Sequence, residues 1–260
     1  MASWSVQTRH LSGRRGRILR IAVVTTMYNE ETLAPLFFRH YDWADEIHVL
    51  YDVDTTDNTL DYCKSFHAII HKLKFPDMMD AGIKQAELNR VFASLTTDWG
   101  IMVDADEFVF AKDESVNMFL HDIPWAMNRL SGWLWNAYRH TTDSDIDDSP
   151  VLWQRRHGDL NFKDWYNKHY IKSCIARPNH FSDFNIGCHD FNPNPHMPHL
   201  IGTHWKMADP ELAIIRRIKN GRDRQSKVNR EMNWQCHDFH ITEEQIRAEC
   251  KAHENDPLLF

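Results

Sequence analysis

The chain has 260 residues, of which 42% are hydrophobic, and its formal net charge is −7 at pH 7. A chain of this length can bury a large core, so we expect one globular domain over residues 1–260. The acidic balance argues against a nucleic-acid partner, because affinity for phosphate backbones comes mainly from clustered lysine and arginine.

Residues 1–19 are interpreted as a basic arm, because the stretch 9–20 is locally rich in arginine. A solvated arm is the simpler interpretation, and peripheral contact with an anionic membrane surface is the alternative. No apolar stretch is long enough for a signal peptide or a membrane span, so we expect a cytoplasmic protein, at most peripheral at the inner membrane face. The five cysteines include no C-x-x-C pair, which favours reduced thiols.

The first half of the chain alternates apolar runs with helical patterns. Strands are predicted at 19–27, 46–51, 67–73 and 99–104, and helices near 30–41, 57–65 and 78–97. Such a βαβ series predicts a largely parallel sheet flanked by helices, because crossovers between parallel strands are right-handed. Ligands of such sheets bind beyond the carboxyl ends of the strands.

The second half has a different pattern. Strands of mixed character are predicted at 130–140 and 168–178, with antiparallel pairing, and 141–150 reads as an acidic loop. Asp209, Pro210 and Gly221 have the spacing of a helix start and stop, and Thr242 with Gln245 predicts a capping box for a final helix. The predicted fold class is therefore α/β, with an antiparallel portion and C-terminal helices.

Three of the predicted strands end in polar residues. Because parallel strands share one carboxyl edge, these residues are expected to converge on a single crevice. They are Thr26, Tyr28, Asn29 and Glu30 after the first strand, Asp52 and Asp54 after the second, and Asp104, Asp106 and Glu107 after the fourth.

The pair Asp104 and Asp106 has the chemistry of a divalent-metal site. Carboxylates are hard oxygen ligands, and Mg²⁺ or Mn²⁺ commonly takes one or two of them together with substrate phosphates. In a straight strand two such residues lie roughly 6.5–7 Å apart, so both can serve one ion only if the chain turns there or a bridging group fills the gap. An acidic turn without a metal is the alternative.

The motifs TTMYNEE, YDVDTTDNTLDYC and DWGIMVDADEF resemble those of family 2-type nucleotide-sugar glycosyltransferases of the GT-A fold. The likeness covers residues 20–110, which would form the nucleotide-sugar-binding half, with residues 111–260 as the acceptor half. It is most similar to the branch whose metal motif reads DADEF. The resemblance implies a metal-dependent and inverting enzyme that uses a nucleotide diphosphate sugar, with a UDP-sugar favoured.

The same resemblance implies roles for individual residues. Asp106 would be the chief metal ligand, with Asp104 beside it, and the ion would carry the diphosphate of the donor. The donor-binding residues would be Thr26, Tyr28 and Glu30 around base and ribose, Asp52 facing the base, and Asp104, Ala105 and Lys84. Gln85 is an alternative to Lys84, and either could be an ordinary surface helix residue.

The turn after the second strand departs from the family pattern. Relatives commonly have D-[DN]-G-S-x-D there, whereas this chain has Asp52-Val53-Asp54-Thr55-Thr56-Asp57 and no glycine. Either Asp52 or Asp54 could therefore contact the nucleoside.

Beyond residue 110 the likeness is weaker. His204 is interpreted as a third metal ligand and Lys206 as a contact of the diphosphate, with a core histidine as the alternative. An imidazole ligand favours Mn²⁺ over Mg²⁺. Trp133, Trp135 and Tyr138 are candidates for stacking on an acceptor sugar, with a core position as the alternative.

Inversion requires a base that removes the proton of the acceptor hydroxyl. Asp190 is the first candidate and His189 the second, while Asp143 and Asp183 compete with them. The acceptor is expected to be a saccharide or a lipid-linked saccharide.

Two other functions remain open at this point. The loop 189–204 contains four histidines and could hold zinc in a hydrolase, although no H-E-x-x-H is present. A catalytically inactive GT-A binding protein would explain the altered second turn. A nucleotidyltransferase is disfavoured because the first turn lacks a glycine-rich phosphate loop.

Overall fold

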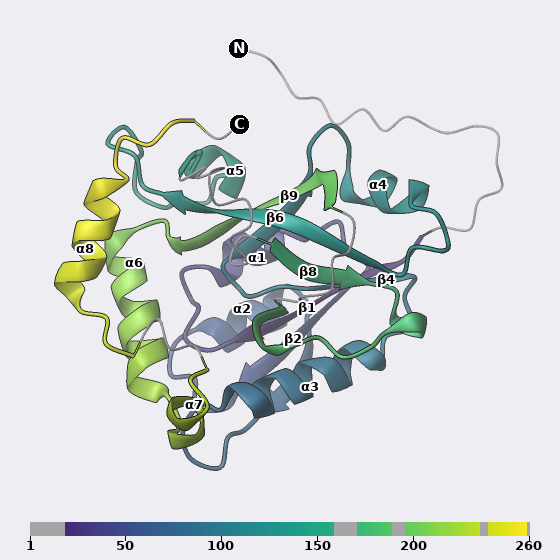
Figure 1. Ribbon diagram of the computed structural model, residues 1–260, viewed down its shortest axis with the longest axis horizontal. Coiled ribbons are helices and arrows are strands. Elements are labelled where there is room, and N and C mark those ends of the chain that lie inside the picture. The colour runs from purple at the N-terminus through teal and green to yellow at the C-terminus, as the bar shows by residue number, and fades with distance from the viewer. Residues whose placement is uncertain (1–18, 159–170, 189–195, 235–238, 259–260) are drawn as a thin grey trace.

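The computed structural model describes residues 19–158, 171–188, 196–234 and 239–258 (Figure 1). Within these ranges the strands form one sheet, in which β7 (His157–Gly158) pairs with β6 outside the main strand order. The sheet order is β3 (Ile69–Leu73), β2 (Glu46–Asp52), β1 (Ile21–Met27), β4 (Trp99–Met102), β8 (Ile171–Ala176), β6 (Arg129–Tyr138), β9 (His196–Met207) and β5 (Glu107–Ala111). The predicted α/β fold class is confirmed.

The parallel half of the sheet contains the four strands predicted in the first half of the chain. β1 pairs in parallel with both β2 and β4, and β2 pairs in parallel with β3. The connecting helices are α1 (Ala34–His40), α2 (Thr59–Ser65) and α3 (Ala81–Ala93). All seven elements lie within the predicted ranges or differ from them by one residue.

The continuous apolar run of β1 is explained by helices on both faces of the sheet. Ile21 and Val23 pack in the cluster that contains residues of α1 and α2, whereas Ala22 and Val24 pack with α3. Figure 1 shows α3 on the opposite face from α1 and α2. A strand buried on both sides needs no polar alternation, as expected for a parallel sheet. On β4, a Cβ at Gly100 would lie 2.5 Å from the Phe92 ring, so glycine permits the close packing of α3.

The second half of the sheet corrects the predicted pairing. β4 with β8, β6 with β8, and β5 with β9 are antiparallel as expected, but β6 and β9 are parallel. Residues 196–204 therefore belong to a strand, although the sequence suggested a histidine-rich loop. A strand between two others can bury its alternate residues, which accounts for the fully buried Trp205.

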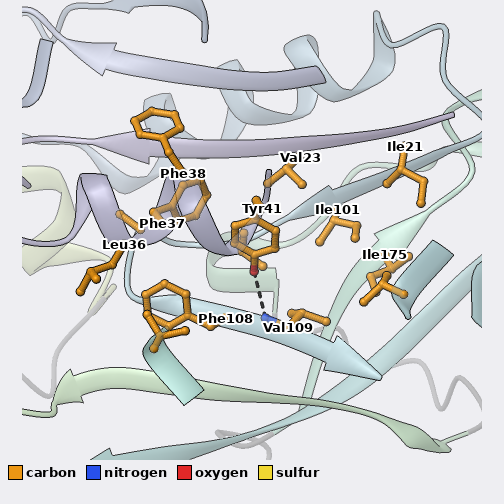
Figure 2. Close-up of a cluster of buried hydrophobic side chains, with 14 of the residues drawn as sticks. Ile21, Val23, Leu36, Phe37, Phe38, Tyr41, Ile101, Phe108, Val109 and Ile175 are labelled. Atoms are coloured by element: carbon orange, nitrogen blue, oxygen red, sulfur yellow. Dashed lines mark hydrogen bonds between the residues drawn. The ribbon is translucent and has the colours of Figure 1, made fainter. Parts of the chain in front are cut away.

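Strand β5 forms one edge of the sheet, and the side chains of His40, at the end of α1, and of Tyr41, which follows it, contact backbone groups of β5. The Tyr41 hydroxyl accepts a hydrogen bond from Val109 N–H at 2.9 Å and donates one to the Glu107 carbonyl at 2.9 Å. His40 Nε2 lies 2.9 Å from the Val109 carbonyl. Figure 2 shows Tyr41 within the apolar cluster, pointing at Val109. Helix α1 therefore fixes the strand that begins at Glu107.

The remaining helices are short. They are α4 (Val116–Asp122), α5 (Val151–Gln154), α6 (Pro210–Ile214), a π-helical turn (Ile215–Gly221), α7 (Lys227–Glu231) and α8 (Glu243–Ala252), with 3₁₀ turns at Pro178–His180, Ile186–Cys188 and Arg222–Arg224. The predicted cap at Asp209 is confirmed, since its side chain accepts from the N–H groups of Glu211 and Leu212. The capping box of Thr242 and Gln245 is also confirmed.

Residues 210–229, which we call the C-terminal strap, lie beside α8, and α7 lies next to the start of α3 (Figure 1). Ala213, Ile214 and Ile218 of the strap pack with Ile246 and Cys250 of α8. In the described part of the chain, no helix has the length and apolar character needed to cross a bilayer.

Candidate functional site

The site lies where the parallel strands end. Because β1 occupies the position between β2 and β4, the turns that follow these three strands are neighbours at one edge of the sheet. After β1, the chain adds β2 and β3 on one side of β1 and then adds β4 on its other side. The strand order therefore reverses at β1, and ligands of such sheets bind at this switch point.

The turns after β1 and β2 are tied together by polar contacts. Asn29 has a positive φ of 51°, which asparagine tolerates better than most residues, and its Oδ1 accepts a hydrogen bond from Thr56 N–H at 2.8 Å. The Thr59 hydroxyl accepts from Glu30 N–H at 2.7 Å. Among the described non-glycine residues, none between 53 and 57 has a positive φ. The second turn thus needs no glycine at these positions.

The predicted metal motif, residues 104–108, lies at the turn between β4 and β5 and at the start of β5. Glu107 N–H donates to the Asp104 carbonyl at 3.0 Å, and Asp104 N–H donates to Glu107 Oε2 at 3.0 Å. Trp205 N–H donates to the Asp106 carbonyl at 2.7 Å, which anchors the turn to β9. The chain therefore turns between Asp104 and Asp106, as a shared ligand site requires.

Two lysines surround Asp104. Lys84 Nζ lies 3.6 Å from Oδ1, and Lys172 Nζ lies 3.5 Å from Oδ2 and also pairs with Glu107. Burial disfavours the charged form of Asp104, but the two ammonium groups outweigh it and hold the pKa of Asp104 below its ordinary value. For Glu107 burial dominates and raises the pKa. Lys172 was not predicted from the sequence, where it is one lysine in a strand of mixed pattern.

Asp106 is almost fully buried and contacts an imidazole and a guanidinium. His204 Nε2 lies 3.3 Å and the Arg216 guanidinium 3.0 Å from its Oδ2 atom. Burial again opposes ionisation, but Arg216 and His204 hold the pKa of Asp106 well below its usual range. Asp106 is therefore an anion in the folded protein.

The orientation of His204 is fixed by Asn136 on the neighbouring strand. The register of β9 places His204 beside Asn136 of β6 on one side and Glu107 of β5 on the other. His204 Nδ1 lies 3.0 Å from Asn136 Oδ1. Since a carbonyl oxygen only accepts, Nδ1 carries the proton and Nε2 is directed at Asp106. Histidine ligands of metals are commonly oriented by such a hydrogen bond on the other ring nitrogen.

Asp106 and His204 fit two positions of one divalent ion. Donor atoms at right angles on an ion with bonds of about 2.1 Å lie about 3.0 Å apart, close to the 3.3 Å between Oδ2 and Nε2. Asp104 is directed at two lysines instead, and among the described residues no group of three or more His, Cys, Asp and Glu side chains is placed to hold one ion. The remaining positions would need phosphate or water oxygens.

Glu30, in the turn after β1, is linked to Asp106 through Arg216. Its carboxylate pairs with Arg216, which therefore links Glu30 to Asp106. Burial raises the pKa of Glu30 to about 7, against the opposing effect of Arg216. Arg216 was missed by the sequence analysis, although residues 216–224 contain four arginines in an acidic chain. That local excess of positive charge was the available signal.

The end of β2 contributes Asp52, which is buried and pairs with Arg224 at 2.8 Å. The Arg224 guanidinium also lies over the Tyr28 ring, 3.4 Å from its centroid. Asp54 is exposed. The sequence did not decide whether Asp52 or Asp54 contacts the nucleoside. Arg224 contacts both Asp52 and Tyr28, so Asp52 is the aspartate that is linked to Tyr28.

The other predicted donor-binding residues are Thr26, Ala105 and Lys206, with Gln85 as the alternative to Lys84. Thr26 is half-buried and pairs in register with Leu50, and Ala105 is buried within the turn of the metal motif. Lys206 follows His204 by two residues in β9, where the pairing with β6 shifts register. Gln85 is buried, donates to Asn89 and accepts from Gly187 N–H, so it belongs to the packing of α3.

Two of the three residues predicted to stack on an acceptor, Trp135 and Tyr138, are buried, which favours the alternative of a core position. Trp135 is only 8% exposed and packs edge-on against Phe110. Tyr138 is 3% exposed, stacks on His253 and donates to Glu249. Both rings therefore belong to the packed interior and not to an exposed platform. The side chain of Trp133 is outside the described part of the structure.

The candidate bases Asp190 and His189 lie outside the described residues. Of their competitors, Asp143 accepts from His140 N–H at 2.9 Å within a loop, and Asp183 is exposed. The proposed zinc loop is a strand from residue 196, and its histidine side chains at 196 and 199 are likewise not described.

No family model matches the sequence, and no curated protein matches it. Solved structures that match this chain include S. aureus TarS 1–349 in complex with UDP, which is 11% identical over 87% of this chain and 77% of that chain, with a TM-score of 0.41. Another S. aureus TarS structure is 14% identical over 90% of this chain, with a TM-score of 0.39, and the match spans 43% of its length. The 4-diphosphocytidyl-2C-methyl-D-erythritol synthase of Anaerococcus prevotii is 12% identical over 62% of this chain and 71% of that chain, with a TM-score of 0.32.

Proposed function

We propose that this protein is a metal-dependent glycosyltransferase that moves a sugar from a nucleotide diphosphate sugar to a saccharide or lipid-linked saccharide. The observation that carries the proposal is the Asp106–His204 pair, oriented by Asn136 at the switch point between β1 and β4. The motifs around this pair are those on which the resemblance to the family 2-type enzymes depends.

The charges around the site suit a diphosphate. Asp106 and His204 would hold Mn²⁺ or Mg²⁺, and the bound ion would neutralise charge on the leaving nucleoside diphosphate. Lys84 and Lys172 stand beside Asp104, within 3.6 Å of its oxygens. These ammonium groups are pre-oriented in a partly buried site, where they stabilise developing negative charge more effectively than in water.

We place the nucleoside of the donor beside Tyr28 and Asp52, at the ends of β1 and β2. Tyr28 offers an aromatic ring and Asp52 a buried carboxylate that can accept hydrogen bonds from a base. A UDP-sugar is the favoured donor. Asp190 is proposed as the base on the acceptor side, so Asp190→Asn should abolish transfer while donor binding continues.

The experiment that tests the proposal is a thermal-shift screen with UDP, GDP, CMP and dTDP, each with and without Mn²⁺. A ligand that binds the native state raises its apparent stability. We expect a Mn²⁺-dependent shift with one nucleotide that is lost in Asp106→Ala and retained in Asp77→Ala, since Asp77 is an exposed aspartate that is not part of the motif. A folded wild-type protein that responds to none of them would contradict the proposal. Hydrolysis of the matching nucleotide sugar would exclude an inactive binding protein.

A further inference from the structure

The C-terminal strap crosses the ends of the parallel strands one after another. Arg216 contacts Asp106 and Glu30, Asn220 Nδ2 donates to the Tyr28 and Asn29 carbonyls at 3.5 and 3.4 Å, and Arg224 contacts Asp52. Ser226 N–H and the Asn229 side chain then bind Met79, and Asn229 Oδ1 accepts from Ala81 N–H, at the start of α3. The strap thus lies across the whole proposed donor site.

The two sides of the strap are chemically different. Its apolar residues Ala213, Ile214 and Ile218 pack with α8, and Arg217 pairs with Glu249 on that side at 3.1 Å. Arg216, the adjacent residue, is directed at the strand ends instead. Both arginines belong to the π-helical turn Ile215–Gly221, a rare conformation that is found frequently at functional sites.

Arg216 contacts the same oxygen atom of Asp106 that would serve a metal ion. Asp106 Oδ2 is the oxygen that lies 3.0 Å from the guanidinium and 3.3 Å from His204 Nε2. An ion held by Asp106 and His204 would take lone pairs of that carboxylate and would repel the guanidinium. The second nitrogen of Arg216 pairs with Glu30, so the side chain remains tethered when the contact with Asp106 is lost.

We infer that Arg216 is a donor-binding residue that gives up its contact with Asp106 and binds the diphosphate of the donor instead. This inference rests on the proposed function. When a diphosphate arrives with its ion, the Nη2 group leaves Asp106 and donates to a phosphate oxygen, while Nη1 stays on Glu30. A planar guanidinium can hold two anionic partners at once, which suits it to this exchange.

The test is isothermal titration calorimetry of wild type, Arg216→Gln and Arg222→Gln, with MnCl₂ alone and with inorganic pyrophosphate in the presence of MnCl₂. For Arg216→Gln we expect Mn²⁺ alone to bind about threefold or more tightly, because a competitor is removed, and pyrophosphate to bind about tenfold or more weakly, because a charged hydrogen bond is lost. Arg222 is the matched control: its guanidinium contacts Asp223 and the Ile241 carbonyl, so Arg222→Gln should titrate as wild type does.

The opposite signs separate this role from a structural one. A variant that merely perturbs the fold would bind both ligands more weakly, and that result would overturn the inference, as would unchanged pyrophosphate affinity. Arg216→Lys keeps the charge without the planar group and should lie between wild type and Arg216→Gln. If wild type binds Mn²⁺ and pyrophosphate with the expected changes in Arg216→Gln but no nucleotide binds, the proposed function fails and the role of Arg216 as a diphosphate ligand stands. A wild-type protein that binds neither Mn²⁺ nor pyrophosphate would overturn both.

Discussion

His204 Nε2 lies 3.3 Å from Asp106 Oδ2, while His204 Nδ1 lies 3.0 Å from Asn136 Oδ1. The hydrogen bond to Asn136 therefore determines which ring nitrogen faces the carboxylate. This relationship joins β6 and β9 to the turn after β4, and it makes Asn136 a positioning residue for the proposed metal site.

Removal of Asn136 should weaken the metal site without unfolding the protein. In Asn136→Ala the ring of His204 loses its orienting partner, and we expect the affinity for Mn²⁺ to fall by about 10–100-fold. Asn136→Asp keeps an acceptor oxygen and should recover most of the affinity. Calorimetric titration with MnCl₂ measures both, and equal affinities of wild type and Asn136→Ala would contradict the role given to Asn136.

Tyr28 should matter for the nucleoside and not for the diphosphate. Its ring lies beside Asp52 through their common partner Arg224. Tyr28→Ala should lower the affinity for UDP with Mn²⁺ by about 5–100-fold, because the base loses one aromatic partner for stacking. Inorganic pyrophosphate should bind as in wild type. Tyr28→Phe retains the ring and should resemble wild type. A parallel loss of pyrophosphate affinity in Tyr28→Ala would instead indicate that the turn after β1 has been disturbed.

Tyr41 should contribute to stability through its hydroxyl group. This hydroxyl bonds to backbone groups of Glu107 and Val109 in the edge strand, and the ring is fully buried. Tyr41→Phe leaves those groups without this partner, so the free energy of unfolding should fall by about 1–3 kcal/mol. Urea denaturation followed by circular dichroism measures the change. Tyr62→Phe, at a half-buried residue of α2, should stay within about 0.5 kcal/mol of wild type.

Lys172 should be needed for stability because it compensates the buried carboxylate of Glu107. It pairs with Glu107, which is 1% exposed, and contacts Asp104. Lys172→Met leaves a buried charge without its partner, and we expect the free energy of unfolding to drop by about 3–5 kcal/mol. The exposed pair of Lys227 and Glu231 provides the comparison, since Lys227→Met should cost less than about 1 kcal/mol. Equal losses in the two variants would refute this account.

The stability of the fold should fall in acid because of His40. Burial lowers the pKa of His40 from 6.5 to about 4, against the opposing hydrogen bond to the Val109 carbonyl. The unfolded chain therefore takes up the proton first. The contribution of His40 is fully present above pH 6.5 and is lost as the pH falls through about 4, and it amounts to at most about 3 kcal/mol.

The measurement for His40 is urea denaturation between pH 4 and pH 7 of wild type and His40→Leu. The variant has no group that titrates at this position, so its stability should depend less steeply on pH over that range. Identical slopes for the two proteins would show that the acid sensitivity arises elsewhere.

The local sequence determined the parallel half of the protein. Apolar runs of strand length, separated by helical periodicity, identified β1 to β4 and α1 to α3, because burial on both faces requires apolar residues at successive positions. The polar residues that follow these strands, including Glu30, Asp52 and Asp106, could be placed at one edge for the same reason.

Only the tertiary structure decided which partners those residues have. Arg216 is 186 residues from Glu30, and Arg224 is 172 residues from Asp52. The parallel pairing of β6 with β9, which orients His204, and the burial of Trp135 and Tyr138 also depend on segments distant in sequence. Hydrophobic periodicity reports whether a residue faces a core, but an ion pair depends on two side chains meeting in space, and that meeting is fixed only when the whole sheet and the strap are assembled.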